Sequence, residues 1–557
     1  MHILKSETVV AMFTKRYLVL SLTAALSTPS MAIDWQYFGS YNPKNGVPDN
    51  MINVADTLPT GLLDIIHKKL PESIDIRKND PSLIADDFGA NLYLVEDADV
   101  RLVFVYEGAG YQNSVGIFDF DPNAQPTAPD QLVDRIVFPN TSTPPLKAGD
   151  AIELGRFKAG SALGFTIVSD GWKPGLGKVN PNQSKNSIFR SLMGLNPEKP
   201  GNDNLNAHAV LLSKPEDGLL VLGFEDLNRE SSSDDDFNDV LLALQVTPYT
   251  AVERSSLASF NNNLDSDKDG VPDSLDAFPR DPEKSSRRYY PSATGQASLM
   301  FEDQWPKAGD YDLNDVVIGY RVIEELNPKG QVVDVKLFYD VLARGAANHN
   351  GFGVHLPGIL PDQILLADAA QRPLTTIRIG DKDAVALTPE QGQNEAVFIM
   401  DPDVTALTTT GESGDCAFFN TVNGCPYHEP IRITAEIHFK EPLDKVGTPP
   451  YNPFIFSTSD RGKEIHLIDQ PPTLLANPKL FGTDDDASDP STGRYYRTAA
   501  NKVWAIDVPD IQDYPAERYD LATVYQEFGI WAESSGRKSA DWFQKGRDEN
   551  RVYKPKK

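Results

Sequence analysis

The chain is poor in cysteine, in histidine and in positive charge. Its 557 residues include 2 Cys and 8 His, and 52 Lys and Arg stand against 80 Asp and Glu, a formal net charge of -28. Nucleic acids and anionic membrane surfaces reward clustered Lys and Arg, so nucleic-acid binding is not expected. A zinc site is disfavoured as well, because the two Cys lack the necessary spacing to a His pair. Cations are the expected partners.

Long apolar runs are missing beyond the first residues. Lys15 and Arg16 precede an apolar stretch over residues 17–26, followed by Ser30-Met31-Ala32. This order is typical of a secretory signal peptide, and the stretch is far shorter than the roughly 20 apolar residues of a spanning helix. The sequence therefore predicts a signal peptide over residues 1–32 and no transmembrane segment. It predicts export to the periplasm, the outer-membrane surface or the extracellular space, without a lipid anchor, because no Cys lies near the cleavage point.

The only cysteines, Cys416 and Cys425, flank a polar, turn-rich loop. In an exported protein such a pair favours a disulfide over a metal site or a reactive thiol. Closing so short a loop is expected to contribute somewhat less than the ~3 kcal/mol of a 15-residue loop. The bond is expected to staple one loop and not a whole domain.

The remaining composition favours a mainly β fold. There are 42 Pro and 39 Gly for turns, together with 26 Phe and 20 Tyr for apolar cores. Residues 333–341 and 431–439 alternate apolar and polar side chains, as half-buried strands do. Earlier strand-like segments lie at 101–106, 151–157, 164–169, 218–224 and 240–246. Helical segments between strands are absent, so the sequence predicts two antiparallel β-sandwich domains joined by an acidic calcium-loop linker.

The predicted organisation has six parts. They are the signal peptide (1–32), a helical or loop segment (33–90) with a helix over 52–70, a first β domain (91–247), a linker (248–290), a second β domain (291–545) and a basic tail (546–557). The basic stretch over residues 537–557 is expected to be frayed. A chain of this length exceeds one ordinary core, which fits more than one domain.

The linker carries an acidic cluster with the spacing of an EF-hand-like calcium loop. Counting Asp265 as position one, Gly270 stands at position six, where a sharp bend is needed. The predicted ligands are Asp265, Asp267, Asp269, the Val271 carbonyl, Asp273 and Asp276. Oxygen donors of this kind suit calcium, which takes about 6 to 8 of them. Position 12 is Asp where Glu is usual, and flanking amphipathic helices are not evident. A solvated acidic linker without an ion is the alternative.

Two further stretches repeat one acidic pattern, Phe-Glu-Asp followed by Asp-x-Asn-Asp. Each predicts a hairpin whose neck carries carboxylates from both strands. Opposed like charges destabilise paired strands, so a divalent cation in each neck would act as a cross-link. The alternative is that Asp and Asn only shape turns here. The predicted ligands are Glu225, Asp226, Asp236, Asn238 and Asp239 in the first neck and Glu302, Asp303, Asp310, Asp312, Asn314 and Asp315 in the second.

These motifs also resemble known families. The linker cluster, which continues Ala277-Phe278-Pro279, resembles a thrombospondin type 3 repeat. The second half resembles the LruC-type domain of exported bacterial proteins through the second neck, His349-Asn350-Gly351-Phe352-Gly353, residues 480–485, Trp504-Ala505-Ile506 and Tyr514-Pro515-Ala516-Glu517. The first half, with residues 107–116 and the first neck, is similar to a small β domain of bacterial adhesin-like surface proteins. The resemblance implies an envelope or extracellular location and calcium binding, without an established catalytic activity.

Function follows from the acidic clusters. Bunched carboxylates beside Asn suit ion ligation better than a desolvated general acid, and no Gly-x-Ser-x-Gly nucleophile motif is present. The sequence predicts a non-catalytic calcium-binding protein of the envelope or surface, acting in adhesion or assembly with an unknown protein or glycan ligand. The alternative is a secreted carbohydrate-active hydrolase that uses paired carboxylates.

Overall fold

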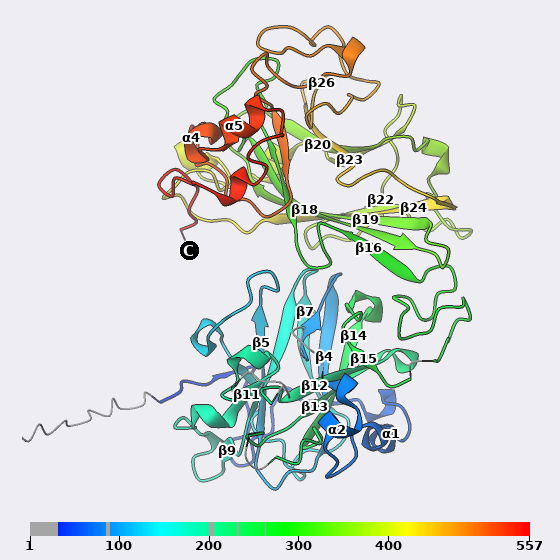
Figure 1. The fold of residues 1–557 in the computed structure, drawn as a ribbon, viewed down its shortest axis with the longest axis vertical. Helices are drawn as coiled ribbons and strands as arrows, with labels where there is room; N and C mark the ends of the chain where they lie inside the picture. Colours follow the sequence, from blue (N-terminus) through cyan, green and yellow to red (C-terminus); the bar gives the residue numbers. More distant parts are fainter. Residues whose placement is uncertain (1–31, 85–89, 200–204, 231–232, 262, 557) are drawn as a thin grey trace, which may run out of the picture.

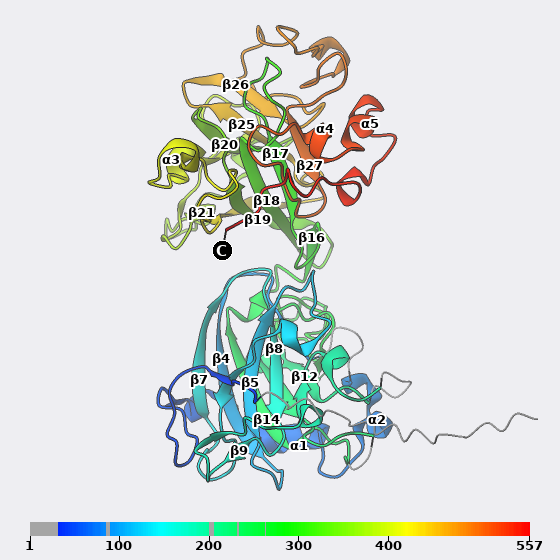
Figure 2. The ribbon, with the colours of Figure 1, turned by 90° about the vertical axis from the view of Figure 1, so that its left-hand side faces the viewer.

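The structure is a computed structural model that describes residues 32–84, 90–199, 205–230, 233–261 and 263–556. Most of the predicted signal peptide, residues 1–31, lies outside these ranges. The fold is mainly β, as predicted, and its sheets form two groups at opposite ends of the long axis in both views (Figures 1 and 2). Within the described ranges, no helix combines the length and apolar character needed to cross a bilayer.

The N-terminal group, here the N-terminal sheet pair, has two large sheets in the orders β1-β6-β5-β8-β11, with β3 on β8, and β15-β12-β13-β14-β4-β7-β2. Pairing is antiparallel except between β1 and β6 and between β12 and β15. One apolar cluster takes residues from both sheets, so they pack face to face. The strands are β1 (Gln36–Tyr37), β2 (Ile52–Asn53), β3 (Leu92–Tyr93), β4 (Ala98–Glu107), β5 (Ser114–Phe120), β6 (Arg135–Phe138), β7 (Asp150–Phe157), β8 (Ala162–Val168), β9 (Trp172–Lys173), β10 (Lys178–Val179), β11 (Ile188–Arg190), β12 (Ala209–Lys214), β13 (Leu219–Phe224), β14 (Val240–Thr247) and β15 (Ala258–Ser259).

The C-terminal sheet pair has the orders β22-β21-β24-β19-β18-β17-β27, with β16 on β18, and β23-β20-β25-β26. Both sheets again share one apolar cluster. The strands are β16 (Ser286–Tyr290), β17 (Ala297–Phe301), β18 (Val316–Leu326), β19 (Val332–Ala343), β20 (Asn350–Leu356), β21 (Thr376–Ile379), β22 (Val385–Ala386), β23 (Ala396–Asp401), β24 (Ile431–Leu443), β25 (Asn452–Ser457), β26 (Asp460–His466) and β27 (Ala505–Val508).

The two sheet pairs share one arrangement with different chain order. The run β12-β13-β14-β4-β7-β2 matches β27-β17-β18-β19-β24-β21, and β6-β5-β8-β11 matches β23-β20-β25-β26, with antiparallel pairing throughout both runs. The hairpin β13–β14 comes last in its pair, whereas β17–β18 comes first. Apart from β2 and β21, whose places in the chain order differ, the strand orders of the two pairs are related by a circular permutation. Equivalent positions can be read across them.

Helices are few and short: α1 (Leu62–Lys69), α2 (Ile76–Asn79), α3 (Val404–Leu407), α4 (Leu521–Val524) and α5 (Phe528–Glu533). The predicted helix over 52–70 is too long, because residues 52–53 form β2 and the helix begins only after Gly61, which has φ 72°. Proline at position 59 and this left-handed Gly separate the two elements. The helix buries Leu62 and Ile66 against the sheet carrying the first hairpin.

The alternation predicted for residues 333–341 is only partly correct. Val335, Leu337, Tyr339 and Val341 are buried as expected, but a register shift between Val332 and Asp334 leaves Val333 half-buried. The opposite face of β19 is also buried, because the segment that precedes β4 packs on it. There Lys336 binds Glu96 at 2.6 Å. Similarly, the Arg321 guanidinium donates to the Val95 carbonyl at 2.7 Å.

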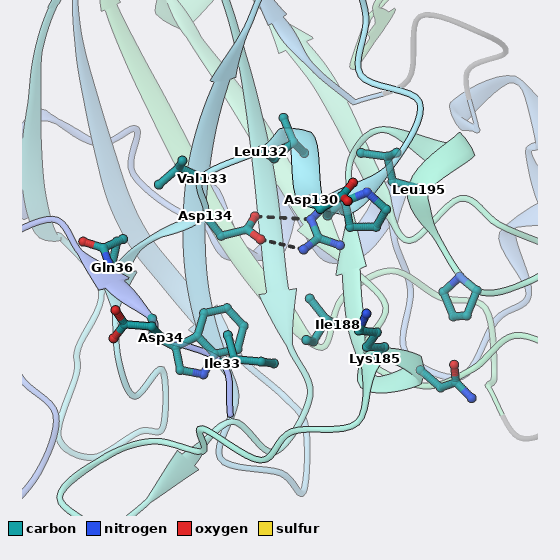
Figure 3. Close-up of a pocket in the computed structure, with 15 residues that line it drawn as sticks. Ile33, Asp34, Gln36, Asp130, Leu132, Val133, Asp134, Lys185, Ile188 and Leu195 are labelled. Carbon is teal, nitrogen blue, oxygen red and sulfur yellow. Dashed lines mark hydrogen bonds and ion pairs between the residues drawn. The ribbon is translucent and has the colours of Figure 1, made fainter. Parts of the chain in front are cut away.

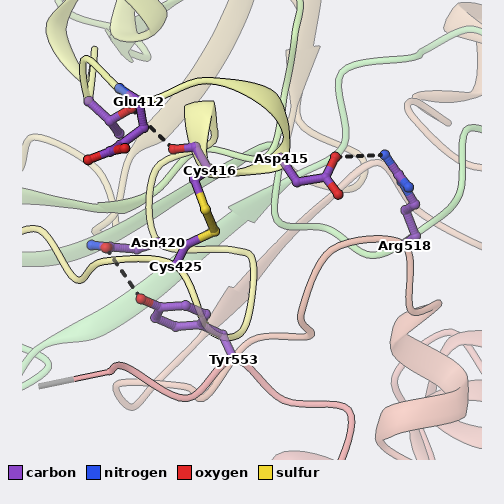
Figure 4. Close-up of a disulfide and its surroundings, with 8 residues drawn as sticks. Glu412, Asp415, Cys416, Asn420, Cys425, Arg518 and Tyr553 are labelled. Carbon is purple, nitrogen blue, oxygen red and sulfur yellow. Dashed lines mark hydrogen bonds and ion pairs between the residues drawn. A yellow bond between two sulfur atoms is a disulfide. The ribbon is translucent and has the colours of Figure 1, made fainter.

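The basic tail is not frayed as the sequence suggested. Val552 and Tyr553 are buried and join a cluster with Tyr514, Tyr525 and Trp542. Figure 4 shows the Tyr553 hydroxyl directed at Asn420, to whose Oδ1 it donates at 3.4 Å. The apolar side chains between the Lys and Arg residues hold this segment against the fold.

The predicted disulfide between Cys416 and Cys425 is present, with the Cα atoms 5.4 Å apart (Figure 4). It closes the loop before β24. Asn420 inside that loop donates to the carbonyls of Leu342 and His428, at 3.1 and 2.7 Å. The bond and the amide together fix the loop beside the C-terminal tail.

Candidate metal centres

Each acidic hairpin neck is built by the same backbone contacts. In the first, the Asp226 amide donates to Asp239 Oδ2 at 2.8 Å, and in the second the Asp303 amide donates to Asp315 Oδ2 at 2.7 Å. The residue before each aspartate extends the strand pairing, because the Glu225 amide donates to the His208 carbonyl at 3.0 Å. The corresponding Glu302 amide donates to the Trp504 carbonyl at 2.9 Å. This pairing fixes three carboxylates in each neck.

The first neck brings Glu225, Asp226 and Asp239 together, with one ligand oxygen of each within 4.8 Å of the others. Glu225 is 1% exposed, and its Oε2 has no hydrogen-bond partner. Asn113, the residue before β5, donates to Asp226 Oδ2 at 2.6 Å, while its own oxygen accepts from the Asp170 amide at 2.9 Å. The second bond fixes the orientation of the amide. Burial and the neighbouring carboxylates raise the pKa of Glu225 to about 10.

The second neck repeats this geometry with Glu302, Asp303 and Asp315, again within 4.8 Å of one another. Glu302 is 0% exposed, and neither oxygen of its carboxylate has a hydrogen-bond partner. Asn350 at the start of β20 donates to Asp303 Oδ2 at 2.6 Å, as Asn113 does to Asp226. Burial and the charges of Asp312, Asp310 and Asp303 raise the pKa of Glu302 to about 8. The three carboxylates therefore lie close together, and no hydrogen-bond donor reaches the oxygens of Glu302.

One cation of the protein approaches the second neck. Lys463 on β26 donates to the carbonyl oxygen of Asp303 at 2.9 Å. Burial lowers the pKa of Lys463, although Asp303 and Asp315 act in the opposite direction. The lysine therefore compensates part of the negative charge without binding the Glu302 carboxylate.

The Asp-x-Asn turns of the two necks serve the fold as well as the acidic groups. Asn238 donates to the carbonyl of Leu70 at 3.3 Å, and Asn314 donates to that of Pro515 at 3.1 Å. The middle residues of the two Asp-x-Asn turns, Phe237 and Leu313, have φ values of 58° and 52° and are buried. The turn-shaping role considered for Asp and Asn is thus visible, and the asparagines tie each hairpin to a distant segment.

The linker cluster is more open than the necks. Asp265, Asp267 and Asp269 bring ligand oxygens within 4.8 Å of one another. Asp276 is 3% exposed, and its Oδ2 has no hydrogen-bond partner. Burial, together with the charges of Asp269 and Asp267, raises the pKa of Asp276 to about 7. Three of the predicted side chains thus converge at the bend formed by Gly270, whose φ is 96°, and Asp276 adds a buried oxygen without a partner.

Asp273 of the linker has a different role. Its two oxygens accept from the backbone amide and the hydroxyl of Ser266, both at 2.7 Å. The side chain is 1% exposed and closes the loop from inside. Asp273 also lies outside the group of converging oxygens and has no unpartnered oxygen, so we place it among the residues that shape the loop. Asp265, Asp267 and Asp269, together with the unpartnered Oδ2 of Asp276, are those that can hold an ion.

Sequence reasoning missed several groups beside the necks. Asn113 and Asn350 were part of the motifs used for the resemblance but not expected as neighbours of Asp226 and Asp303. Glu72, which belongs to none of those motifs, was not expected either, and one of its carboxylate oxygens lies within 4.8 Å of ligand oxygens of Asp234 and Asp236. No local spacing could have found it, because Glu72 is far from the hairpin in sequence.

A pocket of about 800 Å³ lies elsewhere, on the N-terminal sheet pair (Figure 3). Leu132, Val133 and Ile188 contribute apolar walls. Its Asp134 is held by Arg190 at 2.6 Å. Figure 3 shows this ion pair as the polar contact among the residues drawn. The Asp134 carboxylate is thus engaged by a cation of the protein itself.

Fold and site define a mainly β protein with two related acidic hairpins. Residues 330–543 match a family model described as a domain of unknown function (DUF4842), and residues 157–247 match another so described (DUF4114). No curated protein matches the chain. Among solved structures it is similar to a "Putative lipoprotein from Bacteroides ovatus", with 17% identity, a TM-score of 0.38, and coverage of 60% of this chain and 90% of that chain.

Proposed function

We propose that this protein is an exported calcium-binding protein without catalytic activity, whose ions stiffen the hairpin necks and the linker. The observation that carries the proposal is the Glu302 carboxylate, which is 0% exposed and has no donor on either oxygen. Burying an ionised carboxylate without a partner costs several kcal/mol or more. A divalent cation among Glu302, Asp303 and Asp315 would supply the missing partner.

Calcium is the cation that fits the ligands best. Glu225 with Asp226 and Asp239 offers only oxygen donors, as does the second neck. Calcium accepts about 6 to 8 oxygens in irregular geometry, whereas magnesium requires a near-ideal octahedron and keeps several waters. The linker group around Gly270 offers the same chemistry in a looser form. We therefore assign calcium to all three places.

Location and role are part of the same proposal. The disulfide between Cys416 and Cys425 favours an oxidising compartment, in line with the signal-peptide pattern. The resemblance to LruC-type and adhesin-type domains adds an envelope or extracellular setting. With its loops stiffened by calcium, the protein would present a fixed surface to a protein or glycan ligand in adhesion or assembly.

Isothermal titration tests calcium binding directly. The full chain is stripped with chelator and titrated with CaCl₂, and with MgCl₂ for comparison. We expect saturable calcium binding that is strongly reduced in Glu225→Gln/Glu302→Gln, with weaker magnesium binding. Glu412→Gln is the matched control, because Glu412 is exposed and its carboxylate is not among the clustered ligand atoms of the described residues. Calcium heats unchanged by the double substitution would exclude the necks as the binding sites.

The surface role is tested by attachment. The protein is immobilised on beads and presented with a glycan array and with bacterial cells, in calcium or in chelator. We expect attachment that requires calcium and is lost in Glu225→Gln/Glu302→Gln. Hydrolysis of any glycan in the panel, lost on Glu302→Gln, would instead support the enzyme alternative.

A further inference from the structure

A second group of carboxylates lies beside each neck. In the N-terminal sheet pair Glu72, Asp234 and Asp236 bring ligand oxygens within 4.8 Å of one another, and none of them belongs to the first group of that neck. In the C-terminal pair Asp310 and Asp312 bring ligand oxygens within 4.8 Å of one another and of Glu302, which also belongs to the first group. Each neck therefore contains a second group of carboxylates beside the first.

The remote segment that meets each hairpin is docked in the same way. The Ser73 amide donates to Asp236 Oδ2 at 2.7 Å, and the Arg518 amide donates to Asp312 Oδ2 at 2.8 Å. Three residues later, the amides of Ile76 and Leu521 donate to the carbonyls of Asp235 and Tyr311, at 2.9 and 2.8 Å.

This common register makes two glutamates equivalent. Glu72 and Glu517 each stand one residue before the amide that donates to the hairpin aspartate. They come from opposite ends of the chain, because the two sheet pairs are permuted. Each hairpin is thus met by a glutamate at the equivalent position of a remote segment.

Buried acceptors without donors mark the second group independently. Asn314 is 0% exposed and its Oδ1 has no hydrogen-bond partner, and neither has Oε2 of Glu517. Both atoms lie against Gly345, where an added Cβ would be 2.0 Å from the first and 2.7 Å from the second. Glu302, whose oxygens also lack donors, borders the same group. Acceptors facing acceptors in a buried place need a positive charge between them.

We propose that each neck holds two calcium ions, the second bound by a glutamate from the remote segment. The second ion would use Glu72, Asp234 and Asp236 in the N-terminal pair and Asp310, Asp312, Asn314 and Glu517 in the C-terminal pair, with Glu302 shared between its two ions. This inference rests on the proposed calcium function. The second ion clamps the remote segment to the hairpin, in addition to the backbone bonds already there.

The test counts ions in the full chain. The linker site is first removed by Asp267→Asn/Asp269→Asn, so that the remaining calcium belongs to the necks. Equilibrium dialysis against radioactive calcium is then expected to give two ions per neck. Adding Glu72→Gln and Glu517→Gln should remove one ion from each neck and leave the other. Glu412→Gln in the same background is the control and should leave the count unchanged.

The outcomes separate the two proposals. One ion per neck before and after the glutamate substitutions would overturn the second ion and leave the calcium function standing. No ion in either neck would overturn both. The count in the linker variant alone already decides between one and two, so the test does not depend on the folding of the glutamate variants. The single variant Glu517→Gln should affect only the C-terminal neck.

Discussion

Replacing Glu302 by Gln should change stability in opposite directions with and without calcium. In the absence of a divalent ion, the buried carboxylate is disfavoured. Its pKa is raised from 4.5 to about 8 by burial and by Asp312, Asp310 and Asp303. One pKa unit corresponds to about 1.4 kcal/mol, so at pH 7 this group lowers the stability of the ion-free form by about 3 kcal/mol. Glutamine keeps the shape of the side chain and cannot ionise, so it removes this loss of stability.

The sign of the pH dependence follows from the raised pKa. The stability associated with Glu302 is fully present below about pH 4.5 and is lost as the pH rises towards 8. In chelator at pH 7, the variant should therefore melt roughly 6 to 12 °C above the wild type. At pH 5 the difference should shrink to under about 1 kcal/mol. With saturating calcium the order should reverse, because Gln offers one neutral oxygen in place of a carboxylate.

Differential scanning calorimetry at pH 5 and 7, in chelator and in calcium, measures all four conditions. Glu412→Gln should follow the wild type in each, because its side chain is exposed. The reasoning would be refuted by a Glu302→Gln variant that melts below the wild type in chelator at pH 7. Equal stabilisation of both proteins by calcium would also refute it.

Three further predictions concern other parts of the molecule. Burial raises the pKa of Glu325, but the charges of Lys336, Lys284 and Arg287 outweigh burial and lower the pKa to about 2. The stability that Glu325 contributes is therefore present above about pH 4.5 and is lost as the pH falls through 2. Glu325→Gln should lower the free energy of unfolding by about 3 kcal/mol at pH 7 in urea, and a loss below about 1 kcal/mol would contradict the ion-pair account. Reducing Cys416–Cys425 should cost about 2.5 kcal/mol by the same assay, and an unchanged unfolding midpoint would show that the loop is held without it. Gly345→Ala should weaken calcium binding at the second neck, because the added Cβ would lie 2.0 Å from Asn314 Oδ1; calorimetric titration showing wild-type affinity would contradict this.

The hairpins and their acidic residues could be predicted from sequence because their pattern is local. Glu225 directly follows β13 and Asp239 directly precedes β14, so the hairpin pairing places them together. The same holds for the strands β4, β7, β13 and β14, whose predicted segments lie within the observed bounds or within two residues of them. The pairing of these strands and the position of the acidic residues depend on residues that are close in sequence.

The rest depends on contacts between distant parts of the chain. Asn113 reaches Asp226 across 113 positions, and the Arg518 amide reaches Asp312 across 206. The permutation hides the repeat further, because Glu72 precedes its hairpin while Glu517 follows its own. Asp273 fits the calcium-loop spacing, yet its hydrogen bonds to Ser266 show that spacing alone does not fix where a carboxylate points.

The most direct test of the account is a crystal structure of the full chain grown in calcium, with diffraction recorded where calcium scatters anomalously. The account predicts anomalous peaks in both necks, about 2.3 to 2.6 Å from the carboxylate oxygens of Glu225 and Glu302. A structure with no peak at either glutamate, in which each carboxylate instead bonds to protein donors, would contradict it.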